Sequence, residues 1–266
     1  MTPNRAEHLQ AFSWQGRVLL TTGLALFFGR ASDNRLHRHY AVQLALSAFD
    51  AVRLTDEAGR RHAGGFVGCA AGTMHRLEPT DDEVILVYLE PTSTIGLAAQ
   101  KKLDGISIIE LLPQPTRVDA LRSAIANGSP KAAEALLHSI FCGGNLAGGH
   151  HRDPRISALI DSAAFQTVPP ALVQAARQFA LSPSRFSHLF TAEMGIAYSA
   201  FRKWRKLLVT LESVAKGTKL TAAAHEGGFA DSAHFSRTFK DTFGLTPTEA
   251  LFGLQVSPPQ FAAATT

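Results

Sequence analysis

Two segments near the C-terminus have the same pattern, 49 residues apart: Ser182–Phe190 and Asp231–Phe239. Each begins with a residue whose side-chain oxygen can cap the N-terminus of a helix. In each segment, two phenylalanines lie four residues apart and therefore share one face of a helix. The opposite face carries small polar and basic side chains. The repeat therefore predicts two similar amphipathic helices, each docked on a core by its phenylalanines.

The repeat extends upstream of these segments, because Leu172–Ala175 matches Thr221–Ala224 at the same offset. Each unit is then a helix, a tight turn and a second helix, which is the helix-turn-helix arrangement. The helix between the units, predicted over Ser199–Ala215, is about 25 Å long at 1.5 Å per residue. Two units on such a helix could enter successive major grooves about 34 Å apart on one face of DNA. We therefore expect double-stranded DNA as a partner.

The charge distribution agrees with this expectation. Residues 1–149 hold 14 Lys and Arg against 14 Asp and Glu, whereas residues 150–266 hold 12 against 8. The whole net charge of +4 thus belongs to the C-terminal part. A basic half of this kind is the electrostatic footprint of a nucleic-acid-binding module.

The remaining composition favours a cytoplasmic protein. The N-terminal residues lack the basic and apolar pattern of a signal peptide, and the apolar stretch Val18–Phe28 is too short to span a bilayer. Two cysteines, Cys69 and Cys142, do not make a disulfide framework, and we expect both to be reduced thiols. No membrane partner is expected.

Short apolar runs separated by turn residues fill Gly16 to Ile95, which predicts a small β-barrel or jelly roll. Helical spacing follows over Thr116–Ala126 and Pro130–Phe141, up to a glycine-rich stretch at Gly143–Gly149. The apolar faces of these two helices could form a homodimer interface or pack within the chain. From Asp153 onward the pattern is helical. The predicted fold class is α+β, with a β-domain over 1–110, a helical linker and dimerisation region over 111–149, and an all-α domain over 150–256.

Residues 153–252 resemble the AraC/XylS family of bacterial transcriptional regulators. The resemblance is carried by Ala223–Lys240 (AAHEGGFADSAHFSRTFK), Phe243-Gly244, Thr246-Pro247, Leu181–Phe190 and Glu193–Gly195. It implies a sequence-specific DNA-binding regulator without catalytic residues, with RNA polymerase as a further partner if the protein activates transcription. The base-edge contacts that it implies come from Ser184, Ser187 and His188 in the first unit and from Ser232, Ala233, Ser236 and Arg237 in the second. Arg185 and Lys240 would contact flanking phosphates.

A run of basic residues lies on the predicted connecting helix: Arg202, Lys203, Arg205 and Lys206. The run is either a solvated helix face or a patch that contacts the DNA backbone. In the family, an arginine at the place of Arg205 tends to be structural.

A second constellation lies in the N-terminal half, where His37, His39, Gln43 and His75 are candidates for one site. On an extended strand, the first three share the same side because their spacings are even. Three imidazoles and an amide oxygen suit zinc, iron, nickel or copper rather than calcium. The sequence therefore predicts a transition-metal site inside the β-domain.

The spacing of these residues resembles the two motifs of cupins, although Gln43 replaces the usual glutamate and Ala70 the frequent proline. The resemblance implies a cupin-like sensing domain in which the histidines bind a metal, line a small-molecule pocket or are structural. An effector there would change the arrangement or dimerisation of the DNA readers. The alternative is a metal-dependent cupin enzyme fused to a DNA-binding domain. It requires an acid–base pair, for which Glu78 is a weak candidate.

Overall fold

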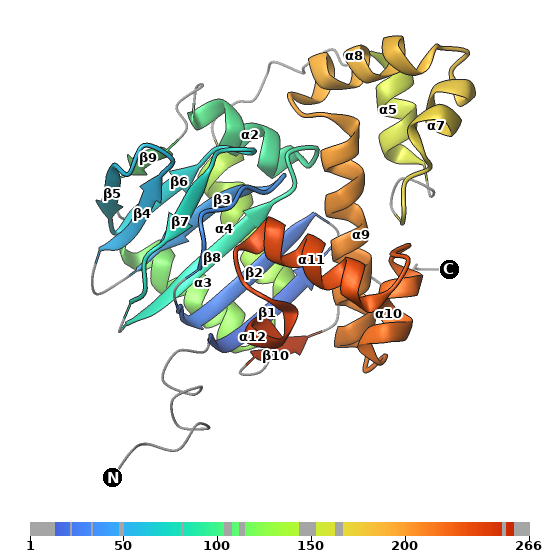
Figure 1. Cartoon of the computed structure of the whole chain (residues 1–266). Coiled ribbons are helices and arrows are strands. Elements are labelled where there is room, and N and C mark those ends of the chain that lie inside the picture. The colour runs from blue at the N-terminus through green and yellow to red at the C-terminus, as the bar shows by residue number, and fades with distance from the viewer. Residues whose placement is uncertain are drawn as a thin grey trace, which may run out of the picture.

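The computed structural model of the chain describes residues 14–21, 23–32, 34–47, 51–80, 82–103, 108–111, 115–143, 153–162, 167–251 and 254–257 (Figure 1). Residues 144–149 of the glycine-rich stretch and the whole tail after Ser257 lie outside this part of the chain. Within it, no helix has both the length and the apolar character needed to cross a membrane.

The N-terminal half forms two sheets. The larger sheet has seven strands in the order β10-β1-β2-β8-β3-β6-β9, and the smaller has the order β5-β4-β7. Every pairing is antiparallel except that of β1 with β10. The strands are β1 (Gln15–Thr21), β2 (Leu24–Arg30), β3 (Val42–Leu46), β4 (Val52–Asp56), β5 (Arg61–Gly64), β6 (Phe66–Cys69), β7 (His75–Leu77), β8 (Glu83–Leu89), β9 (Ile108–Leu111) and β10 (Leu254–Ser257). The short apolar runs seen between Gly16 and Ile95 lie mainly in β1, β2, β3, β4, β6 and β8, and the α+β class is confirmed.

Three helices cover one face of the larger sheet: α2 (Thr94–Leu103), α3 (Pro115–Ala126) and α4 (Pro130–Cys142). Leu121 and Ile125 of α3 and Leu137 of α4 are buried in one cluster with sheet residues such as Leu44 and Val87. These apolar faces are therefore used for packing within the chain, and dimerisation through the region 111–149 stays a prediction.

The C-terminal half contains the two predicted helix-turn-helix units. Its helices are α5 (Pro154–Asp161), α7 (Leu172–Gln178), α8 (Pro183–Met194), α9 (Tyr198–Ala215), α10 (Leu220–Glu226), α11 (Ser232–Phe243) and α12 (Pro247–Leu251). The units are α7–α8 and α10–α11, and α9 runs between them (Figure 1). Its 18 residues make it about 27 Å long.

The expectation that this half is entirely helical is wrong at its end. Strand β10 lies parallel to β1, with Gly16 opposite Leu254 and Leu19 opposite Ser257. A four-residue segment carries too little pattern to predict a strand. Residues 254–257 form a strand because the edge of β1 provides hydrogen-bonding partners. Where the local preference of a segment is weak, such tertiary contacts determine its secondary structure.

The two helix-turn-helix units sit differently on the β-domain. The first unit gathers with α5 at one end of α9, away from the sheets, whereas α11 lies over β1 and β2 (Figure 1). Phe235 and Phe239 of α11 share a buried cluster with Val52, Leu54 and Leu86 of the strands. The second unit is thus docked on the β-domain.

Candidate nucleic-acid interface and histidine cluster

Each recognition helix is fixed at both ends and along its back. The Ser182 hydroxyl accepts the Arg185 N–H at 3.3 Å, and the Asp231 carboxylate accepts the His234 N–H at 2.6 Å. Gly195 and Gly244 close α8 and α11 in the left-handed conformation, with φ of 69° and 75°. The paired phenylalanines at 186, 190, 235 and 239 are buried. The capping and packing predicted from the repeat are confirmed.

This anchoring leaves the opposite helix faces open to solvent. Five of the nine predicted DNA-contacting residues are exposed (Ser184, Arg185, His188, Ala233 and Arg237), and four are half-buried (Ser187, Ser232, Ser236 and Lys240). The Ser236 hydroxyl donates to the Ser232 carbonyl at 2.8 Å, so its oxygen remains available as an acceptor. Both helices therefore present short polar side chains and a few cations.

The basic run on α9 divides into two parts. Arg205 is buried and forms an ion pair at 3.3 Å with Glu90, which follows β8 and is buried too. Arg202, Lys203 and Lys206 instead line a groove between the two units. The structural role that the family resemblance implies for Arg205 agrees with its position. Glu90 was not identified from the sequence, because nothing near it in the chain marks a partner on α9.

The four residues of the predicted metal site come together. His37, His39, His75 and Gln43 are all buried, and one ring nitrogen of each histidine lies within 4.8 Å of the others. The ring centroids of His37 and His75 are 4.5 Å apart, and those of His39 and His75 are 5.0 Å apart. We call these four residues the histidine cluster.

Hydrogen bonds orient the rings of the cluster. The Nδ1 atoms of His37, His39 and His75 lie 2.8–2.9 Å from the carbonyl oxygens of residues 35, 41 and 73. Since a carbonyl only accepts, each Nδ1 carries the proton and each Nε2 carries a lone pair. The Nε2 atoms of His39 and His75 face Gln43 Oε1 at 2.9 and 3.1 Å. The two Nε2 lone pairs and the Gln43 amide thus lie together, and the group that the amide presents to the rings depends on its assigned orientation.

The protonation state of the cluster fits the same chemistry. Burial lowers the pKa of His37 to about 3, with a further decrease caused by His39. Burial also lowers the pKa of His39 and brings that of His75 well below its usual value. All three imidazoles are therefore neutral near pH 7, as metal ligands must be.

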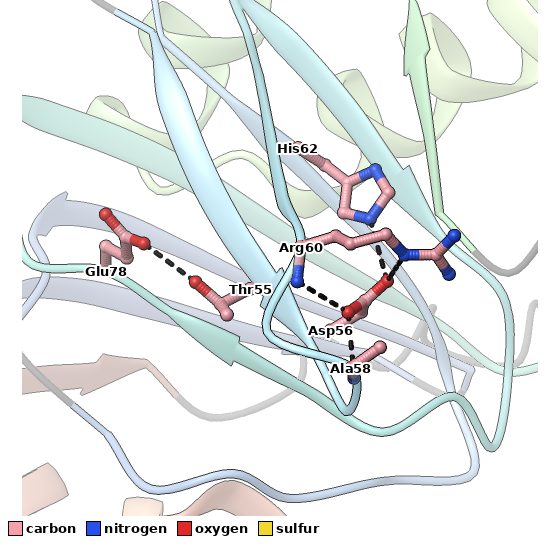
Figure 2. A network of polar contacts seen from close by, with 6 residues as sticks. All are labelled: Thr55, Asp56, Ala58, Arg60, His62 and Glu78. Atoms are coloured by element: carbon pink, nitrogen blue, oxygen red, sulfur yellow. Dashed lines mark hydrogen bonds and ion pairs between the residues drawn. The ribbon is translucent and has the colours of Figure 1, made fainter.

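Glu78 belongs to a different network. Its carboxylate accepts the Thr55 hydroxyl at 2.7 Å (Figure 2) and the Arg61 Nε–H at 2.8 Å. The Thr55 hydrogen bond and Arg61 lower its pKa. In the same figure, Asp56 accepts from the backbone of residues 58 and 60 and closes the β4–β5 turn. Glu78 is held as a carboxylate by structural partners, which does not suit a general acid.

The chain segment that carries His37 also touches the end of α11. The Arg35 N–H donates to the Gly244 carbonyl at 3.0 Å, and Asn34 Nδ2 donates to the Phe243 carbonyl at 3.4 Å. A Cβ at Gly244 would lie 2.4 Å from the Arg35 carbonyl oxygen and 3.0 Å from His37 Nδ1. The histidine cluster is thus in direct contact with the second recognition helix. In the sequence, Gly244 appears only as part of the motif that carries the family resemblance, and nothing marks this contact.

An apolar cavity of about 100 Å³ lies between the two halves. It is bounded on one side by strands β1 and β2 and on the other by α9, α11 and α12. Trp14 and Trp204 line it, and neither indole N–H has an acceptor among the described residues. A ligand there would be mostly apolar.

Comparison with known proteins places the helical units in a family. Residues 175–251 match the helix-turn-helix domain family. The HTH-type transcriptional regulator NimR of Escherichia coli is 29% identical over 110 residues, 41% of this chain and 40% of that protein. The arabinose operon regulatory protein of Escherichia coli is 32% identical over 89 residues, 32% of this chain and 29% of that protein. The chain thus spans less than half the length of these relatives.

Solved structures extend the similarity to the whole fold. A structure of apo ToxT from Vibrio cholerae matches with a TM-score of 0.58 and 12% identity, over 86% of this chain and 97% of that chain. ToxT bound to an unsaturated fatty acid matches with a TM-score of 0.55 and 14% identity, over 88% of this chain and 96% of that chain. At these identities the similarity shows a shared fold only. The resemblance of the β-domain to cupins stays a prediction. Residues 175–251 are a helix-turn-helix domain, and the chain is similar over part of its length to the regulator NimR and to the arabinose operon regulatory protein.

Proposed function

We propose that this chain is a sequence-specific transcriptional regulator that reads double-stranded DNA with α8 and α11. The observation that carries the proposal is the pair of capped helices with buried phenylalanine backs and open polar faces, joined by one helix of about 27 Å. That separation suits two successive major grooves on one face of DNA. Binding positions the protein through phosphates and specifies the site through base edges.

Arg237 is the best candidate for direct base readout, because an exposed arginine can read guanine through two hydrogen bonds. We expect Arg237→Ala to weaken binding to a specific duplex by about 1–3 kcal/mol and to relax specificity at one position. The duplex is obtained by selection from a random DNA pool with the wild-type protein, and affinity is measured by fluorescence anisotropy. Arg117→Ala, which removes an exposed arginine from α3, is the matched control. Equal discrimination between selected and scrambled duplexes by Arg237→Ala and wild type would refute the assignment.

We also propose that the histidine cluster binds a divalent transition metal as the effector. Three neutral imidazoles with carbonyl-bound Nδ1 atoms support this proposal, as does the Gln43 oxygen that faces two lone pairs. The other orientation of the Gln43 amide, with its NH₂ group donating to both rings, gives a closed polar cluster without metal. The metal would link the segment that carries His37, His39 and Gln43 to the strand that carries His75.

Metal binding is tested with tag-free protein loaded with zinc, nickel or iron and then dialysed. Elemental analysis is expected to find about one equivalent per chain, and His75→Ala should bind more than about 100-fold more weakly, because outer-shell losses alone cost 10–100-fold. Gln43→Glu should bind more tightly than wild type, because it adds a negative charge beside the ion. If less than about a tenth of an equivalent is found with every metal, this proposal is wrong. The four residues would then be a closed polar cluster with a structural role.

In that outcome the apolar cavity becomes the leading effector site. Its mostly apolar lining favours an apolar molecule. ToxT, which shares the fold, has been solved with an unsaturated fatty acid bound. At about 100 Å³ the cavity is smaller than a usual ligand pocket of at least about 300 Å³, so such a ligand would have to move α9 and α11 away from the sheet.

Either effector would act through the contact between the two halves. The segment Asn34–His37 joins the histidine cluster to the end of α11, and the cavity lies beneath the same helix. A ligand that prefers one arrangement of this contact would shift the orientation of the second reader relative to the first. The metal-dependent enzyme remains an alternative use of the cluster, but the fixed carboxylate of Glu78 does not support it.

A further inference from the structure

A groove of about 500 Å³ runs between the two helix-turn-helix units, with α9 as its floor. Ser187 of α8 lies on one side, and His234 and Thr238 of α11 lie on the other. The remaining lining residues are Leu172, Tyr198, Ser199, Arg202, Lys203, Lys206 and Phe229. The groove is therefore open between the two recognition helices and bordered by both.

The charge of this groove has one sign. Three cations line it, and no aspartate or glutamate is among its lining residues. Arg202 and Lys206 lie four residues apart on α9, so their like charges share one helix face. The Lys206 ammonium is held over the Phe229 ring at 5.3 Å and contacts the Gly228 carbonyl. Burial, followed by the nearby Arg202, lowers the pKa of Lys206. Cations held together without an acid attract an anion.

Elsewhere in the described part of the chain, several arginines have carboxylate partners. Arg60 pairs with Asp56, Arg61 with Glu78 and Arg155 with Asp153, at 2.7–2.9 Å. Among the described residues, no ion pair is found for Arg202, Lys203 or Lys206, and Arg202 donates instead to the Pro169 carbonyl at 2.8 Å. The groove thus keeps its positive charge available to a partner.

We propose that this groove binds the sugar-phosphate backbone of the DNA strand that passes between the two major grooves read by α8 and α11. The proposal rests on the proposed DNA binding and adds a third contact zone on α9, formed by Arg202, Lys203 and Lys206. A DNA strand supplies phosphates at regular intervals, and the groove lies where the strand must cross α9 if both helices are engaged. Phosphate contacts carry no sequence information, so the groove contributes affinity and register.

The test is the salt dependence of binding to the selected duplex and to a scrambled duplex. Lys203→Gln is the first variant because Lys203 is exposed and its loss leaves packing intact. Arg202→Gln with Lys203→Gln is the second. Each lost phosphate contact is expected to reduce the slope of log K against log salt by about 0.9, so the slopes should fall by about 1 and about 2. The ratio of specific to scrambled affinity should stay unchanged.

Lys219→Gln is the control, because it removes the same charge from an exposed position outside the groove lining. The same slope for Lys203→Gln, the double variant and Lys219→Gln would overturn the groove proposal and leave DNA reading by α8 and α11 intact. A changed specificity ratio would overturn it too, because it would assign these residues to base readout. If the wild-type protein selects no duplex from the random pool, the proposed function itself is wrong.

Discussion

Glu90→Ala is expected to destabilise the folded chain by about 3–5 kcal/mol, because it leaves the Arg205 guanidinium buried without its carboxylate. The two side chains are 7% and 3% exposed, and the pair is 3.3 Å apart. Glu90 follows β8 and Arg205 is on α9, so this pair joins the β-domain to the connecting helix of the readers. Water can reach Arg205 only if α9 moves away from the sheet. The variant is therefore expected to loosen the contact between the two halves first.

Urea unfolding followed by tryptophan fluorescence measures this effect, since both tryptophans of the chain line the cavity between the halves. The double variant Glu90→Leu with Arg205→Met should regain most of the stability that Glu90→Ala loses. Replacing both members of a buried ion pair by apolar residues often leaves the free energy of unfolding unchanged. Asp119→Ala, which breaks the exposed Arg122–Asp119 pair, should cost less than about 1 kcal/mol. A loss below about 1 kcal/mol for Glu90→Ala would show that the ion pair does not hold the halves together.

Gly244→Ala is expected to cost more than the same change at Gly195, although the two glycines end equivalent helices with nearly equal φ. A Cβ at Gly195 would meet nothing within 4 Å, so its cost is the left-handed conformation alone, about 1–2 kcal/mol. A Cβ at Gly244 would meet the Arg35 backbone at 2.4 and 2.8 Å. We expect an additional loss of about 1–3 kcal/mol from this overlap.

The pair of variants isolates the contact between the histidine cluster and α11. Gly244→Ala should displace the segment that carries His37, and should therefore weaken zinc binding if the cluster holds metal, whereas Gly195→Ala should leave zinc binding unchanged. Stability is measured by urea unfolding and zinc affinity by competition with a chelating dye. If both variants lose equal stability, the segment Asn34–His37 moves away from the added Cβ without a loss of folding free energy. Such a segment could not transmit a signal to α11.

The features that the sequence predicted well are those stabilised within a few residues along the chain. Ser182 and Asp231 cap amides three residues ahead, and the phenylalanine pairs share a helix face at four-residue spacing. Such signals are complete in a short segment, and they placed α8 and α11. Short apolar runs separated by turn residues likewise predicted the strands β1, β2, β3, β4, β6 and β8, because both signals lie within a short segment.

Features that depend on distant parts of the chain could not be predicted in this way. Strand β10 forms because the edge of β1 is available for pairing. The four residues of β10 carry no sequence pattern that predicts this pairing. Glu90 and Arg205 are 115 residues apart, and nothing beside either residue points to the other. The histidine cluster was predicted from the sequence in part. Its members were found from even spacing and residue type, but the ring orientations come from carbonyls of three separate loop positions.

The sequence by itself thus determined that this chain carries two helix-turn-helix units with similar recognition helices, because caps, turns and apolar spacing are local properties. The tertiary structure alone decided that the two units are placed differently relative to the β-domain. The second is docked on the β-domain through Gly244, Phe239 and the segment that carries His37, while the first stands at the far end of α9. Docking depends on the shape and charge of surfaces formed by residues far apart in the chain, which no short segment encodes.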